Sequence, residues 1–163
     1  MAAGGFITVQ GAVSALDYLA GRSTALQAEW DAKTAGGDPQ PKATYLMLLT
    51  QLIADEQTDM ASLIGMEAAG TGYARQPVPW GAADTTGRQA TNTDLIQFGP
   101  FSDPSGLGAP ITGAALVTRM ASSAGQPNGV ALMAWNLESA ITTQQNQALQ
   151  LPAGSLTMTL AVA

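Results

Sequence analysis

Residues 155–162, Ser-Leu-Thr-Met-Thr-Leu-Ala-Val, carry the clearest structural pattern in the chain. Leu156, Met158, Leu160 and Val162 alternate there with small or polar residues. Successive side chains of a β-strand point to opposite faces, so this period of two predicts a strand with one apolar face. Such a strand needs neighbouring strands and a core to cover that face.

Other segments supply these neighbours. Turn-forming residues separate short apolar runs, as in SDPSG at residues 102–106 and QPNG at residues 126–129. This spacing favours a mainly β chain, folded as an antiparallel β-sandwich of jelly-roll-like type rather than as a parallel sheet. The expected strands span residues 43–50, 75–80, 94–98, 112–119, 130–137 and 156–162.

Helical spacing replaces this pattern near the N-terminus, over residues 13–35. Val13, Leu16 and Ala20 share one face of a helix, and Gly21 interrupts the pattern. We therefore expect two short helices that form an N-terminal helical arm.

The second helix has signals at both ends. Thr24 and Gln27 have the spacing of a capping box, and the sequence GGDPQP at residues 36–41 ends the helix and forms a linker. We expect an arm with its linker over residues 1–42 and a β-sandwich domain over residues 43–163.

The composition is that of a packed chain with few charges. Its 163 residues suit one domain, and charged residues make up 11%, against about 25% in an ordinary domain. This scarcity favours a surface that contacts other protein. The net charge of −6 and the scattered lysines and arginines argue against a nucleic-acid partner. No apolar run reaches the ~20 residues of a membrane helix, and residues 1–13 lack a signal-peptide pattern, so we expect a soluble protein without a membrane partner.

Most catalytic arrangements lack their residues in this chain. Histidine and cysteine are absent, which excludes a Ser-His pair, a thiolate nucleophile and zinc sites built on these ligands. Lys33 and Lys42 flank the linker, a poor place for a desolvated base. Gly106 and Gly108 begin a dinucleotide-binding pattern that fails at Ile111. We expect no catalytic residue, no cofactor and no metal.

Asp55, Glu56 and Asp59 form an acidic cluster. Two carboxylates suffice for glycoside hydrolysis, so a glycosidase site and a calcium site are both open interpretations. The preferred interpretation is a solvated loop that opens a short helix over residues 59–67, with Asp59 as its N-cap. The spacing of a calcium loop is not satisfied.

Three tryptophans are the remaining candidates for a binding surface. Trp30, Trp80 and Trp135 belong to a residue type that stacks on sugars or anchors protein interfaces. Trp135 lies in the apolar run of residues 130–137, which favours a place in the core. Trp80 follows a Pro-Val-Pro sequence, and prolines cannot donate in a central strand, so we expect an edge or loop position.

The sequence GTGYARQPVPW at residues 70–80 resembles a signature of small virion proteins of tailed bacteriophages. These proteins, of actinophage type, are described as tail-fibre-like or capsid-decoration proteins. The resemblance covers residues 43–162, whereas residues 1–42 match less clearly. Further matches, in consistent order, are residues 43–51, 59–67, 95–101, 113–118, 129–137 and 152–160.

Four residues of the signature have ready physical roles. Gly70 and Gly72 permit backbone conformations closed to other residues. Arg75 is suited to pair with an acidic group or to donate to carbonyls of a neighbouring loop. Tyr73 offers apolar area with a polar tip. A structural role is preferred over a ligand-binding role for all four.

The resemblance implies a non-enzymatic structural protein of a tailed-phage virion, assembled in the bacterial host cytoplasm. Its expected partners are itself, as a homo-oligomer such as a trimer, and other virion proteins. It would sit on the capsid as decoration or on the tail as a minor tail protein. The alternatives are a receptor- or carbohydrate-binding module at the tail tip, a carboxylate-dependent glycan depolymerase, and an assembly factor absent from the virion.

Overall fold

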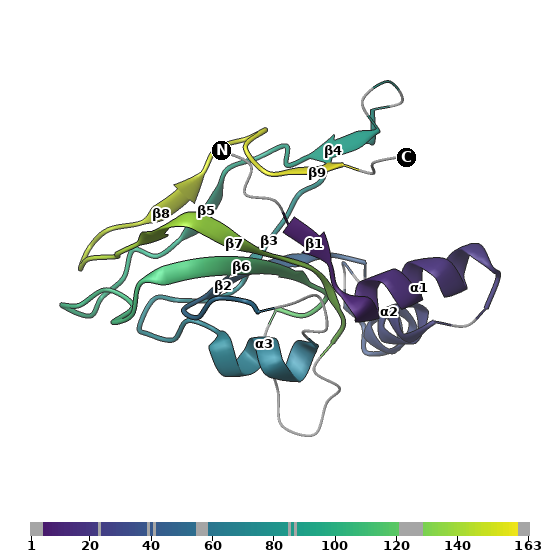
Figure 1. Cartoon of the computed structure of the whole chain (residues 1–163), viewed down its shortest axis with the longest axis horizontal. Helices are drawn as coiled ribbons and strands as arrows, with labels where there is room; N and C mark the ends of the chain where they lie inside the picture. The colour runs from purple at the N-terminus through teal and green to yellow at the C-terminus, as the bar shows by residue number, and fades with distance from the viewer. Residues whose placement is uncertain are drawn as a thin grey trace.

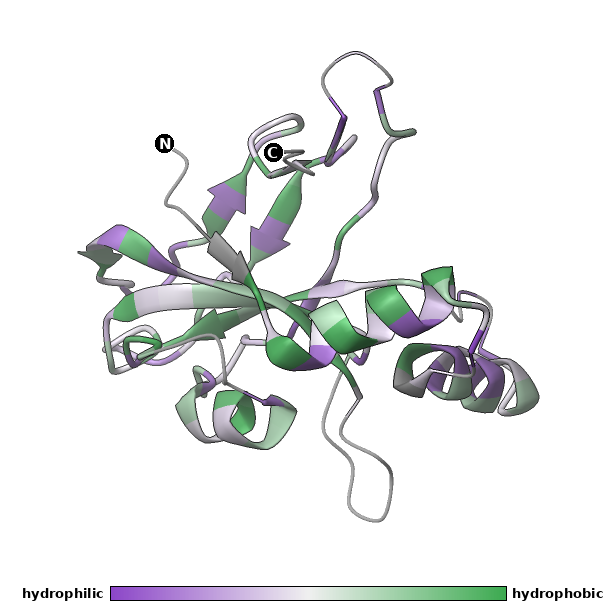
Figure 2. Ribbon diagram, turned by 45° about the vertical axis from the view of Figure 1, so that its right-hand side comes forward, coloured by the Kyte–Doolittle hydropathy of each residue, from purple (hydrophilic) through white to green (hydrophobic). Residues whose placement is uncertain are grey.

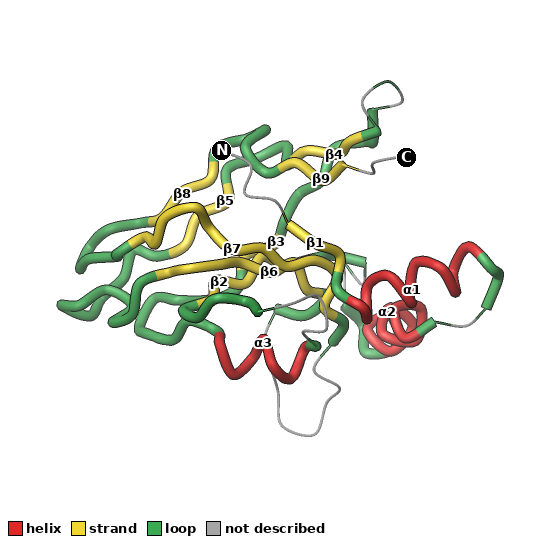
Figure 3. The backbone as a smooth tube through the Cα atoms, in the orientation of Figure 1, coloured by secondary structure: helices red, strands yellow, loops and turns green. Residues whose placement is uncertain are grey.

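A computed structural model describes residues 5–22, 24–38, 40, 42–54, 59–84, 86, 88–120 and 129–159. It confirms a mainly β, antiparallel architecture, joined in the described part of the chain by three short helices (Figure 3). The strands are β1 (Gly5–Ile7), β2 (Tyr45–Leu49), β3 (Gln76–Pro77), β4 (Gln89–Thr91), β5 (Ile96–Phe98), β6 (Ile111–Val117), β7 (Ala131–Ile141), β8 (Leu149–Leu151) and β9 (Thr157–Thr159). The helices are α1 (Val9–Leu19), α2 (Ala25–Ala35) and α3 (Met60–Met66).

A five-stranded antiparallel sheet, with the order β1-β7-β6-β2-β3, forms the centre of the molecule. Figure 1 shows α3 on one side of this sheet and two small two-stranded sheets, β4-β9 and β5-β8, on the other. The arrangement is sandwich-like, with the central sheet as the shared layer.

Both faces of the central sheet are covered, and β2 shows this most clearly. All five of its residues are buried. Tyr45, Met47 and Leu49 join the core cluster that includes residues of α3, whereas Leu46 and Leu48 join the cluster that includes residues of β5. A strand covered on both sides has no solvent face, which explains why its sequence is a continuous apolar run without alternation.

The pairing of β6 with β7 contains a register shift between Ile111 and Gly113. Such an irregularity changes which face the following side chains reach. Ile111 and Ala114 therefore belong to the same core cluster, although three residues separate them in the strand.

The helices agree with their sequence signals. Gly21, with a φ of +68°, lies between α1 and α2, and the Thr24 Oγ1 accepts a hydrogen bond from the Gln27 N–H at 2.8 Å. Asp59 caps α3 and accepts from the Ser62 N–H, also at 2.8 Å. The interruption, the second-helix cap and the short third helix are confirmed.

The strands are mostly where the sequence placed them, although several are shorter. The segment predicted over residues 75–80 is reduced to β3, which lies at the edge of the central sheet. Leu160 and Val162, at the end of the predicted last strand, lie outside the described residues. The strands β1, β4 and β8 were not expected; each is three residues long and pairs only with a distant segment.

The arm helix α1 packs against β7 with its smallest residues inward. Gly11 and Ser14 are its buried residues, and a Cβ at Gly11 would lie 2.3 Å from the Leu132 backbone oxygen. The buried Thr8 ties the start of the helix to the sheet, since its Oγ1 accepts from the Gly11 N–H and donates to the Ala131 carbonyl. The large apolar residues of α1 are consequently exposed, and Figure 2 shows the hydrophobic positions along this helix in green.

Two helical glycines give a matched test of this packing. We expect Gly11→Ala to lower the free energy of unfolding by about 1–3 kcal/mol, because the added methyl meets rigid backbone. Gly65→Ala in α3 meets nothing within 4 Å and should raise it by about 0.5–1 kcal/mol. Urea unfolding followed by circular dichroism measures both. Equal stabilities of the two variants would contradict the close approach of α1 to β7.

Candidate functional site

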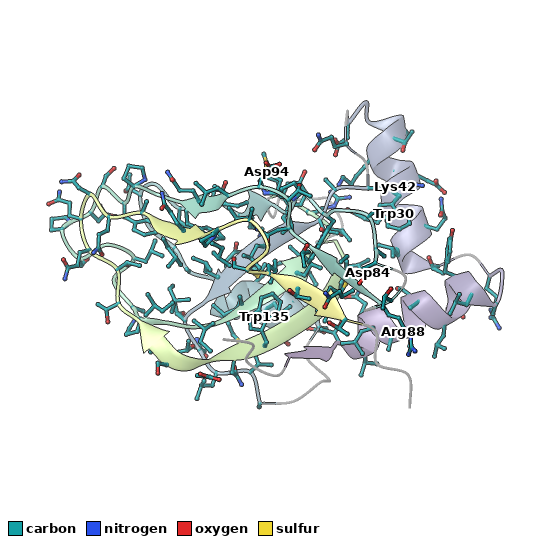
Figure 4. All side chains as sticks on the ribbon, turned by 90° about the horizontal axis from the view of Figure 1, so that it is seen from above. Trp30, Lys42, Asp84, Arg88, Asp94 and Trp135 are labelled. Carbon is teal, nitrogen blue, oxygen red and sulfur yellow. The ribbon has the colours of Figure 1, made fainter. Side chains whose placement is uncertain are left out.

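An apolar cavity of about 470 Å³ lies between the central sheet and the chain from β8 to β9. Its walls include Trp135 on β7, Trp80 after β3, and Leu149 and Leu151 on β8. Met158 on β9 closes part of the opposite side. Figure 4 shows Trp135 close to β9 when the molecule is seen from above.

The fold brings Trp80 and Trp135 to one cavity although 55 positions separate them in the sequence. Both side chains are half-buried and pack against the core cluster beneath the cavity. The Trp80 indole Nε1 donates to the Thr44 Oγ1 at 2.9 Å, which fixes the ring beside the edge strand. The expected edge position of Trp80 is confirmed, and Trp135 is at once a core contact and a cavity wall.

Asn92 holds one wall of the cavity in place. Its side chain is almost wholly buried; the Nδ2 donates to the carbonyls of Asp94 and Pro152, and the Oδ1 accepts from the Leu156 N–H at 2.8 Å. A buried amide that satisfies both ends fixes the turn before β9. No sequence pattern indicates this role, because a lone asparagine between threonines is typical of an ordinary turn.

The lining of the cavity limits the chemistry that it can support. None of the described residues that line it carries an ionisable side chain; its polar members are the neutral Gln150, Ser155, Thr157 and Thr159. General acid–base catalysis needs a titratable group within reach of the substrate. The cavity is therefore suited to an apolar group or an uncharged polar molecule, bound by packing and a few hydrogen bonds.

The signature segment forms a buried polar cluster on another part of the sheet. The Arg75 side chain is 1% exposed and makes two hydrogen bonds to the Glu67 carboxylate, at 2.8 and 2.6 Å. The Tyr73 hydroxyl donates to the same carboxylate at 3.0 Å and accepts from the Leu48 N–H of β2. Arg75 was expected to pair with an acid or bind carbonyls, and both contacts occur, the second to the Arg119 carbonyl at 3.0 Å.

A second ion pair continues this cluster to the arm. The Arg119 guanidinium binds the Glu29 carboxylate of α2, with the Nη2 to Oε2 distance at 2.8 Å. The Glu29 side chain is 4% exposed. The Lys33 ammonium of α2 also donates to the Thr118 carbonyl at the end of β6. The polar contacts therefore run from the end of α3, across the sheet, to α2.

Gly72 confirms the conformational role expected of the signature glycines. Its φ is +92°, and a Cβ there would lie 2.5 Å from the Pro100 backbone oxygen. Only glycine tolerates both constraints, so the backbone reaches Tyr73 and Arg75 through a turn that other residues do not adopt.

The acidic cluster is only partly described. Asp55 and Glu56 lie outside the described residues. Asp59 is exposed, and its hydrogen bond from the Ser62 backbone lowers its pKa. A general acid in glycoside hydrolysis needs a raised pKa, so Asp59 serves as a cap rather than as that acid.

Trp30 is separate from the other two tryptophans. It lies on α2 beneath the Lys42 ammonium, which is 5.5 Å from the ring centroid (Figure 4). Cation–π contact of this kind fastens α2 to the chain that leads into β2. Of the three candidate tryptophans, Trp80 and Trp135 therefore share the cavity and Trp30 does not.

The described ranges of the chain contain no group of three or more acidic, histidine or cysteine side chains placed to hold a metal ion. Within the same ranges, no helix combines the length and the apolar character needed to cross a membrane.

The chain is thus a small, mainly β protein with a sandwich-like arrangement and an uncharged cavity beside its central sheet. Residues 32–159 match the family described as podophage GP4 fiber I protein gp80. The match covers most of the chain, so the protein belongs to this family of phage fibre proteins. A search among curated proteins gave no match. The membership confirms the phage structural class that residues 43–162 resemble, and it adds part of α2 to the matched region.

The buried ion pair can be tested by a double-mutant cycle. We expect Arg75→Met to lower the free energy of unfolding by about 3–5 kcal/mol, because it leaves the Glu67 carboxylate without its partner. The double variant Glu67→Leu/Arg75→Met should recover most of this loss, since neither charge remains. Urea unfolding of the wild type, the two single variants and the double variant gives the coupling free energy between the two side chains. Additive losses would show that the two side chains do not act as a pair.

The Tyr73 hydroxyl predicts a loss of stability in alkali. Burial and the neighbouring Glu67 carboxylate raise its pKa far above the usual value of 10.0. The folded protein thus holds the Tyr73 proton where the unfolded chain has lost it, so stability is complete below pH 10 and falls as the pH rises further. Tyr73→Phe should reduce this fall between about pH 10 and 12.

Urea midpoints at each pH measure the effect. Tyr45→Phe is the control, because burial and Asp38 also raise the Tyr45 pKa, but Tyr45 does not share the Glu67 carboxylate to which the Tyr73 hydroxyl donates. Equal alkaline slopes for wild type and Tyr73→Phe would contradict the assignment.

Proposed function

We propose that the protein is a non-enzymatic structural component of a tailed-phage virion that works as a homo-oligomer. The family match over residues 32–159 carries the proposal. Two features support it. The described lining of the cavity has no group for acid–base chemistry, and the ionisable residues of the signature are committed to buried pairing.

The family description favours a place on the tail or its fibres, as a minor tail protein, over capsid decoration. The partners are further copies of the chain and other virion proteins, reached after assembly in the host cytoplasm. Residues 1–42 serve as the arm that engages neighbours, and residues 43–163 form the β-sandwich domain, to whose central sheet the arm contributes the strand β1. The ion pair between Glu29 and Arg119 fastens the two.

A second candidate is a receptor- or carbohydrate-binding module at the tail tip. One observation favours it: Trp80 and Trp135 line a single cavity that also holds neutral hydrogen-bonding side chains. Indole faces and neutral polar groups together suit an uncharged sugar. Both candidates share the virion location and differ in the number of copies that they require.

Copy number in purified virions tests the proposal and separates the candidates. Quantitative mass spectrometry against the major capsid protein should give a number of copies that fits the tail and its fibres. Hundreds of copies per particle would place the protein on the capsid and exclude the tail-tip receptor. Absence from purified virions would contradict the structural role itself.

A further inference from the structure

The outer surface of α1 is unusually apolar for an exposed helix. Leu16 is 67% exposed, Leu19 82% and Val13 52%, whereas the buried residues of the helix are Gly11 and Ser14. The polarity is therefore reversed: the large apolar side chains face solvent, and the small ones face the sheet. An ordinary surface helix has its apolar stripe against the core.

The close packing under α1 holds this orientation in place. A rotation that turned Val13 and Leu16 inward would have to replace Gly11 at its contact with the Leu132 backbone, where no Cβ fits. Thr8 and Gln10 bind the backbone of Ala131 from the first turn. The apolar face is thus presented to solvent by the fold.

The spacing of this face is that of a helix–helix contact. Val9, Val13, Leu16 and Ala20 follow intervals of four, three and four residues, and we call them the α1 seam. Apolar residues at such intervals form the knobs and holes of paired helices. With the flanking Leu19, four large apolar side chains of the helix are exposed together, and a contiguous apolar patch of this kind marks an interaction site.

Charge disfavours a lipid surface as the occupant. The helix α1 has one charged residue, Asp17, which lies 3.6 Å from Arg22, and the chain has a net charge of −6. Helices that lie on anionic membranes carry lysine and arginine along their polar face. A protein surface is the better match for a seam without cations.

We infer that the α1 seam is where copies of this chain associate, with the α1 helices of neighbouring copies packed against each other about a symmetry axis. A seam with this spacing needs a helix with the same spacing opposite, and a second copy always supplies it. The other two described helices are already engaged, α2 through Glu29 and α3 through Met60 and Leu63. The inference rests on the homo-oligomer of the proposed function and names its contact surface.

The first test is the oligomeric state of the purified chain by sedimentation and light scattering. Wild type should be oligomeric, and Leu16→Glu should weaken association about 100-fold, because it places an unpaired charge at the centre of the contact. Leu95→Glu is the matched control, since Leu95 is also an exposed leucine but lies outside α1; it should associate like wild type. A monomeric wild type, or an unaffected Leu16→Glu, would overturn the inference.

A second test does not depend on how the charged variant folds. The chain has no cysteine, so Val13→Cys introduces a single thiol into the seam. Mild oxidation should convert most of this variant to a disulfide-linked dimer, whereas Leu95→Cys should stay unlinked. Failure of Val13→Cys to cross-link above that control would sink the inference. The copy number in virions tests the proposed function separately, because it reports where the protein is located and not which surface joins its copies.

Discussion

The buried pair of Glu67 and Arg75 is the interaction on which the rest of the architecture depends. A guanidinium removed from water must satisfy its donors inside the protein, and here three of them reach two distant partners, the Glu67 carboxylate and the Arg119 carbonyl. The pair fixes the end of α3 against the start of β3, and its third contact fixes the end of β6. Desolvation offsets much of the attraction, so the contribution of the pair is a unique geometry more than a large stability. The position of α2 also depends on that geometry, because Arg119, whose carbonyl Arg75 binds, pairs with Glu29 of α2.

The covered sheet decides where function can reside. Because α3 lies over one face and the small sheets lie over the other, β2 and β6 present almost no side chain to a partner. Two other places in the described part of the chain are open: the cavity at the margin of the second layer and the arm at the end of the sheet. These two places differ in character: Asn92 and the turn that it holds shape a recess, whereas Gly11 and Thr8 present a convex helix. The cavity suits a small molecule, and the arm helix suits a protein partner.

The sequence predicted local features well and long-range pairings poorly. The caps at Thr24 and Asp59 and the apolar run of β2 are local, since each depends on residues a few positions apart. The strands β1, β4 and β8 could not be predicted from the sequence. Each has only three residues, too few to show a period of two, and each pairs with a strand far along the chain. The helical period of α1 is visible in the sequence. The face of α1 that packs against the sheet is not, because it depends on the close approach of Gly11 to the Leu132 backbone. Of the candidate site, the residue types Trp80 and Trp135 were foreseen, while their shared cavity required the fold.

The junction between β1 and β7 has a mechanical consequence. The helices α1 and α2 lie between β1 and β2 in the chain, so a force applied to them would reach the sheet through both strands. The strand β1 runs antiparallel to β7 over three residue pairs. Inter-strand hydrogen bonds lie across the strands, so tension along β1 would load them in shear and they would have to yield together. Tension across the strands would instead open them one at a time. The link through β1 therefore has a strong and a weak direction of pull, and the ion pair from α2 to Arg119 adds a non-covalent attachment that shares the load.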